Sequence, residues 1–450
     1  MFCLFYLILS IGNFLQTTYG ARESVGFIIL QQPLNPYHKT LADDLFEDIR
    51  NQYKVIQPEI NLILDSDYLE VKGFWTIHPL FKLIAEKKEV DWVVFLEDHT
   101  RIDLEKLLQV LQSYDSSQDV FAGYALEDLN PTIIHHFAST GRESILQYPH
   151  FSAGFFISTT LANKLTQRCG DCIFSIDPKY ELAKFIWNAT SVKLTSEPRM
   201  CLTKHGEDCA TWIKESFPDC GVSVPSSKVG VAVKTCQKFH KDRVPVVKGT
   251  WAPDVENLLF FSDVRDKSVP TVKLDVENTP SGHCEKTIRI MKHYVDNQTL
   301  IDWLVIADDD TLLNFGRLKK LLSCYNSSHD IALGERYGYS VTSAFGYDYL
   351  TGGSGMVFSM STVKKLVKHC RCPSTDSPDD MIIGLCLKSL AIPATHSPYF
   401  HQARPDDYSP QFLASFEHVS FHKHWMINPY EVYREWLQEP AQSLLSHSEL

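Results

Sequence analysis

Three consecutive aspartates, Asp308, Asp309 and Asp310, directly follow the apolar run 303–307. In an open α/β sheet, ligands bind beyond the carboxyl ends of the strands, so a buried strand over 303–307 would bring these carboxylates to that edge. Carboxylates packed this closely repel one another unless a cation neutralises them. A hard divalent ion such as Mn²⁺ or Mg²⁺ prefers oxygen ligands, and it would stabilise a departing diphosphate.

Two other interpretations of the aspartate run are weaker. A solvated acidic turn or a helix N-cap would need no metal, but it does not explain three carboxylates after a buried strand. Phosphatases of the haloacid-dehalogenase type carry Asp-x-Asp-x-(Thr/Val), whereas here Leu312 occupies the fifth position. We therefore expect a metal site.

A second acidic pair, Asp379-Asp380, follows Ser377-Pro378 and precedes an apolar, helix-like segment. These carboxylates are either helix caps or include a general base that deprotonates a sugar hydroxyl. The first part of the chain has only Asp177-Pro178 near the corresponding place. Because this pair is missing from the altered copy described below, we favour the catalytic interpretation.

Histidines and glycines near these aspartates are further candidates. A histidine cluster could complete the coordination shell of the cation. It comprises His396, His401, His418, His422 and His424. The segment 351–355, Thr-Gly-Gly-Ser-Gly, includes Gly353. Its glycines either let the backbone approach a ligand closely or only shape a tight turn.

The acidic motif occurs twice, and only one copy keeps its aspartates. Residues 91–100 read DWVVFLEDHT and residues 302–311 read DWLVIADDDT, so Glu97, Asp98 and His99 align with the three aspartates. Residues 151–158 also align with 351–359, and Leu165 and Cys169 match Leu366 and Cys370 at the same offset. Three matched blocks in one order predict a duplicated fold with one working site and one altered copy.

Strand-like and helix-like segments alternate in both halves, which predicts an α/β fold with mostly parallel sheets. The expected strands are 25–30, 92–96, 229–234, 258–262, 271–274, 303–307 and 331–333. The expected helices are 74–87, 287–295 and 315–324. We expect a signal peptide over 1–20, a degenerate domain over 21–217, a linker over 218–228, a catalytic domain over 229–446 and a retrieval signal over 447–450.

The composition and the termini predict a compartment. The net charge of −12 argues against a nucleic-acid partner, which would require a basic face. The apolar N-terminus predicts a cleaved secretory signal, after which no membrane span is expected, although an uncleaved anchor is the alternative. The terminal His-Ser-Glu-Leu resembles a KDEL-type retrieval signal, which predicts residence in the endoplasmic reticulum lumen and a KDEL-type retrieval receptor as a partner.

Cysteine usage agrees with an oxidising lumen, where most of the 12 cysteines should pair. Cys169 and Cys172 have the spacing of a redox or zinc motif, but no second pair stands at zinc-finger spacing, so structural disulfides are expected. Removing Cys3 with the signal peptide leaves an odd number of cysteines. Cys386, inside an apolar run, is the predicted free thiol.

Seven ordered segments of the second half resemble the Fringe-like β-1,3-glycosyltransferases. They are AVKTCQKFHKDRVPVVKGTW, ADDDTLLN, GERYGY, TGGSGMVFS, SPDDMIIG, SPYFHQARPDDY and VSFHKHW. The resemblance covers about 229–437 and implies two tandem GT-A-like, Rossmann-like domains. It also implies inverting transfer of glucose from UDP-glucose to the 3-hydroxyl of O-linked fucose on thrombospondin type 1 repeats, with Mn²⁺ or Mg²⁺ as cofactor.

The resemblance also implies roles for single residues. Asp380 would be the base, with Asp379 the second choice. Metal ligands would be Asp310 and Asp308 with His422, and His401 is the alternative histidine. The nucleotide-sugar contacts would come from Thr235, Asp308, Asp309 and Gly353.

Some alternatives stay open at this point. The same fold could use UDP-galactose or UDP-N-acetylglucosamine as donor. A protein of a different class, a non-catalytic lectin or quality-control factor of the endoplasmic reticulum, would also suit the altered first copy. We expect that copy to bind the acceptor protein or to buttress the active half.

Overall fold

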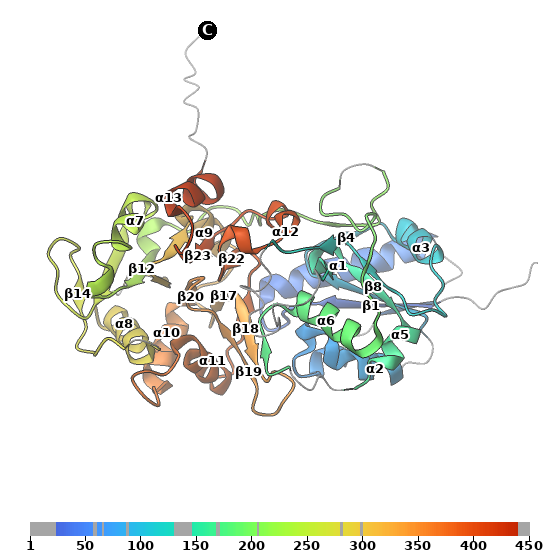
Figure 1. Cartoon of the computed structure of the whole chain (residues 1–450), viewed down its shortest axis with the longest axis horizontal. Coiled ribbons are helices and arrows are strands. Elements are labelled where there is room, and N and C mark those ends of the chain that lie inside the picture. Colours follow the sequence, from blue (N-terminus) through green and yellow to red (C-terminus); the bar gives the residue numbers. More distant parts are fainter. Residues whose placement is uncertain are drawn as a thin grey trace, which may run out of the picture.

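A computed structural model describes residues 24–56, 61–64, 67–86, 90–129, 146–167, 172–204, 207–279, 282–297 and 300–439. The expected signal peptide and the terminal retrieval signal lie outside these residues. Within the described ranges, no helix is long and apolar enough to cross a membrane. Figure 1 shows two α/β units side by side along the long axis.

The first unit, which we call the first half, is built on a six-stranded sheet with the order β10-β5-β8-β3-β1-β2. Its strands are β1 (Ser24–Leu30), β2 (Asn61–Leu64), β3 (Trp92–Glu97), β5 (Phe121–Gly123), β8 (Phe155–Ser158) and β10 (Thr195–Ser196). One face packs on α1 (Pro36–Ile56) and α3 (Leu104–Gln112). The other packs on α2 (Phe81–Glu86), α5 (Thr159–Lys164) and α6 (Pro178–Thr190).

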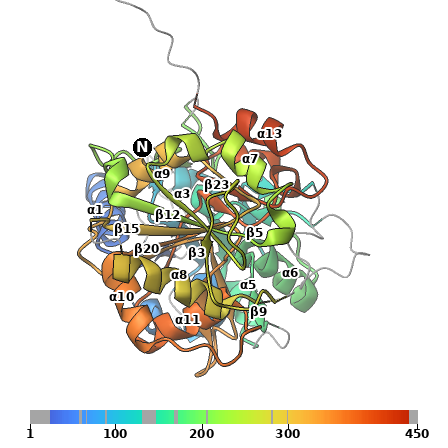
Figure 2. The same cartoon turned by 90° about the vertical axis from the view of Figure 1, so that its left-hand side faces the viewer.

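The second half is built on a seven-stranded sheet with the order β14-β13-β12-β15-β20-β17-β21. Its strands are β12 (Val229–Lys234), β13 (Asn257–Ser262), β14 (Val272–Lys273), β15 (Trp303–Asp308), β17 (Ala332–Gly334), β20 (Met356–Ser359) and β21 (Ala394–His396). Figure 2 shows α8 (Cys284–Asn297), α10 (Met360–His369) and α11 (Asp379–Ser389) on one face of this sheet. The helices α7 (Val244–Gly249) and α9 (Phe315–Leu322) cover the other face.

The two sheets correspond strand by strand. The order β5-β8-β3-β1-β2 in the first half matches β17-β20-β15-β12-β13 in the second. In both, the second strand of this order, β8 or β20, runs antiparallel to its two neighbours. The registers also agree, because Val25 pairs with Trp92 as Val229 pairs with Trp303. Most neighbouring strands run parallel, so the predicted α/β class is confirmed.

Smaller sheets complete both halves. In the first, β4 (Thr100–Ile102) pairs with β11 (Thr211–Ile213), and β6 (Ala125–Leu126) pairs with β7 (Tyr148–Pro149). In the second, β23 (Ser420–His422) lies between β16 (Thr311–Leu313) and β22 (Phe400–His401). A fourth small sheet joins β18 (Arg336–Tyr339) and β19 (Tyr347–Leu350) to β9 (Phe174–Ser175) of the first half. The short helices α12 (Pro410–Ala414) and α13 (Pro429–Val432) lie near the end of the described chain.

One predicted helix is interrupted. The segment expected as a helix from Phe74 forms two short 3₁₀ turns, Phe74–Thr76 and His78–Leu80, before α2 begins at Phe81. Ile77 adopts a positive φ of 67°, and Pro79 has no N–H to donate, so a continuous α-helix cannot form there.

The prediction that Cys386 is the free thiol is wrong. Cys386 on α11 is bonded to Cys370 at the end of α10, because the neighbouring helices bring the two Cα atoms to 5.5 Å. Among the described cysteines the free one is the buried Cys236. The other pairs are Cys201–Cys209, Cys220–Cys324 and Cys284–Cys372, and Cys172 is also disulfide-bonded.

The two halves contact each other through specific polar groups. The side chain of Gln32 donates to the carbonyl of His396 at 2.9 Å and accepts from its N–H at 2.6 Å, as a neighbouring strand would. The ring of His38 bridges Asp98 of the first half and the hydroxyl of Tyr325 of the second. Both contacts lie beside a cavity that residues of the two halves line together.

Candidate metal and catalytic site

The three aspartates lie where the sequence analysis expects them, at the carboxyl end of a central strand. Asp308 ends β15, and Asp309 and Asp310 form the turn into β16. The hydroxyl of Thr311 holds this turn: it accepts from the N–H of Asp308 at 3.1 Å and donates to the carbonyl of Gly353 at 2.8 Å. Pairing of β16 with β23 then sets His422 opposite Thr311.

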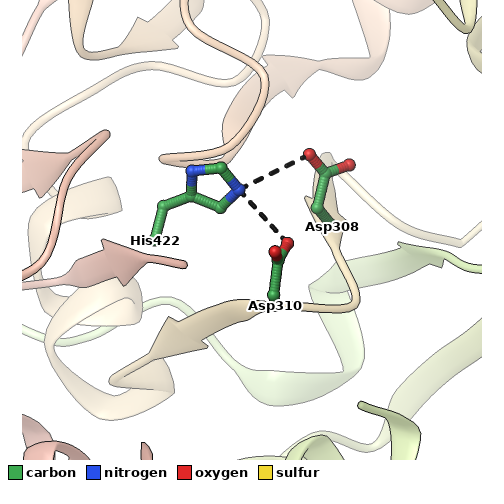
Figure 3. A group of neighbouring side chains, drawn as sticks. All are labelled: Asp308, Asp310 and His422. Carbon is green, nitrogen blue, oxygen red and sulfur yellow. Dashed lines mark hydrogen bonds and ion pairs between the residues drawn. The ribbon is translucent and has the colours of Figure 1, made fainter. Parts of the chain in front are cut away.

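Asp308, Asp310 and His422 form a group that could hold a metal ion (Figure 3). Their ligand atoms all lie within 4.8 Å of one another. The Nδ1 of His422 lies 3.1 Å from the carbonyl of Gln402, which can only accept, so Nδ1 carries a proton and Nε2 is the atom that would bind an ion. Two carboxylates and an imidazole nitrogen suit Mn²⁺, or Mg²⁺ with more water.

The electrostatics of Asp310 fit a metal ligand. Burial opposes its ionisation, but the hydrogen bond with His422 at 3.2 Å and the charges of His422 and Arg243 lower its pKa to about 2. The carboxylate is therefore ionised at neutral pH, as a ligand must be.

Gly353 leaves room for the imidazole. A Cβ atom at this position would lie 2.3 Å from Cε1 of His422, closer than such atoms can approach. The glycine-rich segment therefore permits a close approach, here to a site side chain. This is a more specific role than the tight turn that was the alternative.

Asp309 points to a different set of partners. It accepts from the hydroxyl of Thr235 at 2.7 Å and from Arg243 at 3.0 Å. Burial raises its pKa to about 6 in spite of these hydrogen bonds. Thr235 and Asp309 were both predicted to contact the nucleotide sugar. They are hydrogen-bonded to each other, and both line one pocket.

This pocket is lined both by the three aspartates and by cations. Lys238, Arg243 and Lys286 are among the cations. Arg243 pairs with Asp309 and Asp310 at 3.0 and 2.9 Å, and the ammonium group of Lys286 donates to the carbonyl of Thr235. Cations beside metal-binding carboxylates suit the diphosphate of a nucleotide sugar. The sequence analysis did not identify these three cations, because lysine and arginine are too common on surfaces to signal a site alone.

Lys234 connects the two acidic clusters. Its Nζ lies 3.0 Å from Asp308 and 2.6 Å from Asp379, and the side chain is 4% exposed. Burial disfavours the charge, but the two carboxylates raise the pKa of Lys234 well above its usual value. Sequence reasoning missed this residue, although a lysine that ends a buried apolar strand was a usable signal.

The two carboxylates of the second acidic pair differ in their surroundings. Asp379 is buried, accepts from Lys234 and from Thr287 at 2.6 Å, and these partners lower its pKa to about 2 against the effect of burial. Among the described residues, the hydrogen bonds to Asp380 come from the backbone N–H groups of Met381 and Gly352. Burial and the neighbouring charge of Asp379 raise the pKa of Asp380 to about 6. Asp380 therefore has the carboxylate better able to take up a proton.

His401, the alternative metal ligand, is not brought to this group. It pairs in register with Phe421, one residue before His422, so the two histidines project to opposite faces of the small sheet. Its ring stacks on Phe421 at 4.6 Å, and its Nε2 lies 2.8 Å from Nδ1 of His418. His401 is buried in an aromatic cluster away from the aspartates.

The first half repeats the scaffold of this site without its ligands. Thr100 there makes the same bonds as Thr311, accepting from the N–H of Glu97 at 3.0 Å and donating to the carbonyl of Ser152 at 2.9 Å. Opposite Thr100 stands Ile213, in the place that His422 has in the second half. Leu30, beside Glu97, replaces Lys234.

Asp98 of this altered copy has become part of the interface. Its carboxylate lies 2.7 Å from Nδ1 of His38 and 3.0 Å from Nδ1 of His99. Burial opposes ionisation, but both histidines lower its pKa well below the usual range. Since His38 also contacts Tyr325 across the interface, the former site now helps to join the halves.

Comparison with known proteins agrees with this geometry. The sequence model of the family described as Fringe-like matches residues 78–188 and 224–447. A β-1,3-glucosyltransferase of Mus musculus is 42% identical over 419 residues, which cover 91% of this chain and 86% of the relative. The Homo sapiens β-1,3-glucosyltransferase is also 42% identical, over 91% of this chain and 84% of its own length.

The chain belongs to the Fringe-like family. The resemblance stated from the sequence is thereby confirmed, as is the prediction of a β-1,3-glucosyltransferase. A more distant Fringe-like relative, the β-1,3-N-acetylglucosaminyltransferase lunatic fringe of Xenopus laevis, is 26% identical over 40% of this chain and 54% of its own. The chain is therefore a glycosyltransferase, which implies a nucleotide-sugar donor.

Proposed function

We propose that the second half transfers glucose from UDP-glucose to the 3-hydroxyl of O-linked fucose on thrombospondin type 1 repeats, with inversion at the anomeric carbon. The main support is the pairing of a proton-accepting Asp380 with a cation-lined pocket that ends at Asp308, Asp310 and His422. The likeness to named β-1,3-glucosyltransferases supports the sugar and the linkage.

In this proposal Asp380 is the general base. Its carboxylate takes the proton of the fucose 3-hydroxyl, and the oxygen attacks the anomeric carbon of glucose from the side opposite to UDP. The bond between that carbon and the diphosphate oxygen breaks as the new glycosidic bond forms. No covalent enzyme intermediate is needed, because a single displacement inverts the configuration.

Asp379 and Lys234 hold the base in place. The ion pair between them ties the first turn of α11 to the end of β12, and the N–H of Gly352 donates to Asp380. These contacts orient Asp380, and the ammonium group of Lys234 is paired with Asp308 and Asp379. We assign Asp379 a positioning role, which leaves Asp380 as the first choice for the base.

On the donor side, Asp308, Asp310 and His422 would hold Mn²⁺ or Mg²⁺. When bound, such an ion stabilises negative charge on the departing diphosphate. Arg243, Lys238 and Lys286 line the same pocket and would contact phosphate oxygens, and Thr235 lies at the edge facing the nucleotide. We propose that the first half, which has Ile213 in place of the histidine, is non-catalytic.

We further propose that the enzyme works in the endoplasmic reticulum lumen and that a KDEL-type receptor retrieves it through the terminal His-Ser-Glu-Leu. The cysteine pairs fit an oxidising compartment. Immunofluorescence of the full chain, with and without the last four residues, tests this. Loss of those residues should release the protein into the medium.

A donor panel tests the reaction. The full chain is incubated with Mn²⁺, an O-fucosylated thrombospondin repeat and UDP-glucose, UDP-galactose or UDP-N-acetylglucosamine, each with and without chelator. We expect a disaccharide on the repeat only with UDP-glucose and only without chelator. Transfer from another donor would correct the sugar, and folded protein that binds the repeat without any transfer would favour a lectin.

A further inference from the structure

The hairpin formed by β18 and β19 lies between the catalytic helix α11 and the first half (Figure 1). We infer that this hairpin forms the acceptor-sugar subsite, with Tyr347 as the ring against which the fucose lies, and that the first half holds it there through Trp75 and Phe174. The inference rests on the proposed function and adds the part of the chain that recognises the acceptor.

The front of the hairpin faces Asp380. Strand β19 packs so tightly on α11 that a Cβ atom at Gly384 would lie 2.4 Å from Cβ of Tyr349. Lys388, also on α11, donates to the carbonyls of Ala344 and Gly346 at 3.1 and 2.7 Å and so ties the hairpin tip to the same helix. Strand β19 also continues into Gly352, which donates to Asp380.

Tyr347 is the hairpin ring best placed for a sugar. It is half-buried and lies two residues before Tyr349, so both rings project from the same face of β19, with centroids 6.4 Å apart. Tyr349 is the residue that packs on Gly384, one helical turn after Asp380. The ring of Tyr347 packs on that of Tyr339 at 5.6 Å between centroids. Aromatic faces beside a carboxylate suit a deoxyhexose, which offers both C–H surface and hydroxyls.

The back of the hairpin is held by the first half. Strand β9 adds to β18, and the ring of Phe174 contacts that of Tyr339 at 5.2 Å. The indole N–H of Trp75 donates to Asp348 at 3.2 Å, and the guanidinium of Arg336 lies 4.3 Å from the Trp75 ring. A Cβ atom at Gly338 would lie 3.0 Å from the indole, so ring and strand are in direct contact.

A chain of ring contacts therefore runs from the first half to the strand that packs on α11: Phe174 meets Tyr339 edge to face, and Tyr339 meets Tyr347 at a tilt. The donor pocket lies elsewhere, and none of the hairpin residues lines it. Changes in this chain of rings should accordingly alter use of the acceptor substrate and leave use of the donor substrate intact. Trp75 and Phe174 act through the hairpin and are positioning residues.

The first test replaces the proposed contact ring. Tyr347→Ala should raise the KM for the O-fucosylated repeat about tenfold. The KM for UDP-glucose and the acceptor-independent hydrolysis of UDP-glucose should stay within about twofold of wild type, and Tyr347→Phe should restore most acceptor affinity. Tyr430→Ala, at a residue 43% exposed on α13, is the control and should change neither KM.

The second test addresses the first half. Trp75→Phe keeps an aromatic side chain but removes the donor to Asp348, and we expect the acceptor KM to rise about fivefold with an unchanged donor KM. Trp212→Phe, in the first half but on β11, is the matched control. Thermal unfolding of each variant separates positioning from loss of fold.

The outcomes separate the two proposals. If wild type does not transfer glucose to the repeat, the proposed function fails and this inference with it. If wild type is active and Tyr347→Ala changes both KM values equally, or neither, the function stands and the acceptor subsite is refuted. If Trp75→Phe behaves like Trp212→Phe, the positioning role of the first half is refuted.

Discussion

The ammonium group of Lys234 lies 2.6 Å from the carboxylate of Asp379, in a pair that joins the end of β12 to the start of α11. The same ammonium lies 3.0 Å from Asp308, which belongs to the candidate metal group. One buried cation thus connects the donor side of the site to the helix that carries the proposed base. The ion pair with Lys234 keeps Asp379 ionised, and the negative charge of Asp379 makes Asp380 hold its proton more readily.

Lys234→Met should destabilise the fold by about 3–5 kcal/mol, because it leaves the buried carboxylate of Asp379 without its cation. Urea unfolding followed by tryptophan fluorescence measures the change. Lys228→Met removes a lysine 42% exposed and 3.7 Å from Asp302, and it should cost less than about 1 kcal/mol. Equal urea midpoints for the two variants would show that the Lys234 pair contributes little.

Activity should fall as the pH decreases through about 6, because Asp380 must be deprotonated to accept a proton and burial with Asp379 raises its pKa to that value. The pH dependence of kcat/KM, measured with saturating Mn²⁺, reports this. Asp380→Asn should lower kcat by about 10²–10⁴ and leave the KM for UDP-glucose unchanged. If Asp380→Asn kept residual activity and its kcat/KM fell at low pH as in wild type, the titrating group would be a different residue.

Gly353→Ala should weaken Mn²⁺ binding by about 10- to 100-fold, since the new Cβ would displace the His422 ring from its position between Gln402 and Asp310. The close approach is 2.3 Å to Cε1 and 2.4 Å to Nδ1 of the ring. Calorimetric titration with Mn²⁺ gives the affinity without an activity assay. Gly316→Ala, at the start of α9, is the control, and wild-type affinity in both variants would remove this role of Gly353.

Glu335→Gln should stabilise the protein increasingly as the pH rises from 5 to 8. Burial raises the pKa of Glu335 from 4.5 to about 8 beside the cavity between the halves, so the folded state favours the protonated form. Stability from this carboxyl is complete below its unfolded pKa and is lost as the pH rises through about 8. Glutamine stays neutral, so the difference in Tm from wild type should grow over this range and then level off.

The control for this substitution is Glu431→Gln on an exposed residue of α13. A Tm difference for Glu335→Gln that is the same at pH 5 and pH 8 would contradict the raised pKa. The comparison needs the metal-free form at each pH, so that loss of a bound ion does not enter the measurement.

Local patterns in the sequence predicted much of the fold. The strands at 229–234 and 303–307, the helix near 315 and the two aligned acidic turns all have short-range signatures: an apolar run, a cap or a repeated motif. Helical periodicity predicted a helix that begins before α2, whereas the positive φ of Ile77, two residues before Pro79, interrupts it. The pairing of Cys386 with Cys370 was missed because it depends on two helices packing side by side.

By itself, the sequence determined that one of two repeated turns carries three aspartates after a buried strand, and that a second acidic pair precedes a helix. Only the tertiary structure decided which histidine lies beside the aspartates, because β16 and β23 pair across more than a hundred residues. His401 pairs with Phe421, the residue before His422, and therefore projects to the other face of the sheet. It also revealed Lys234 as the shared cation and Ile213 as the residue that replaces the histidine in the first half. Neighbours along the chain set local conformation, whereas contacts between distant strands arise only when the whole sheet assembles.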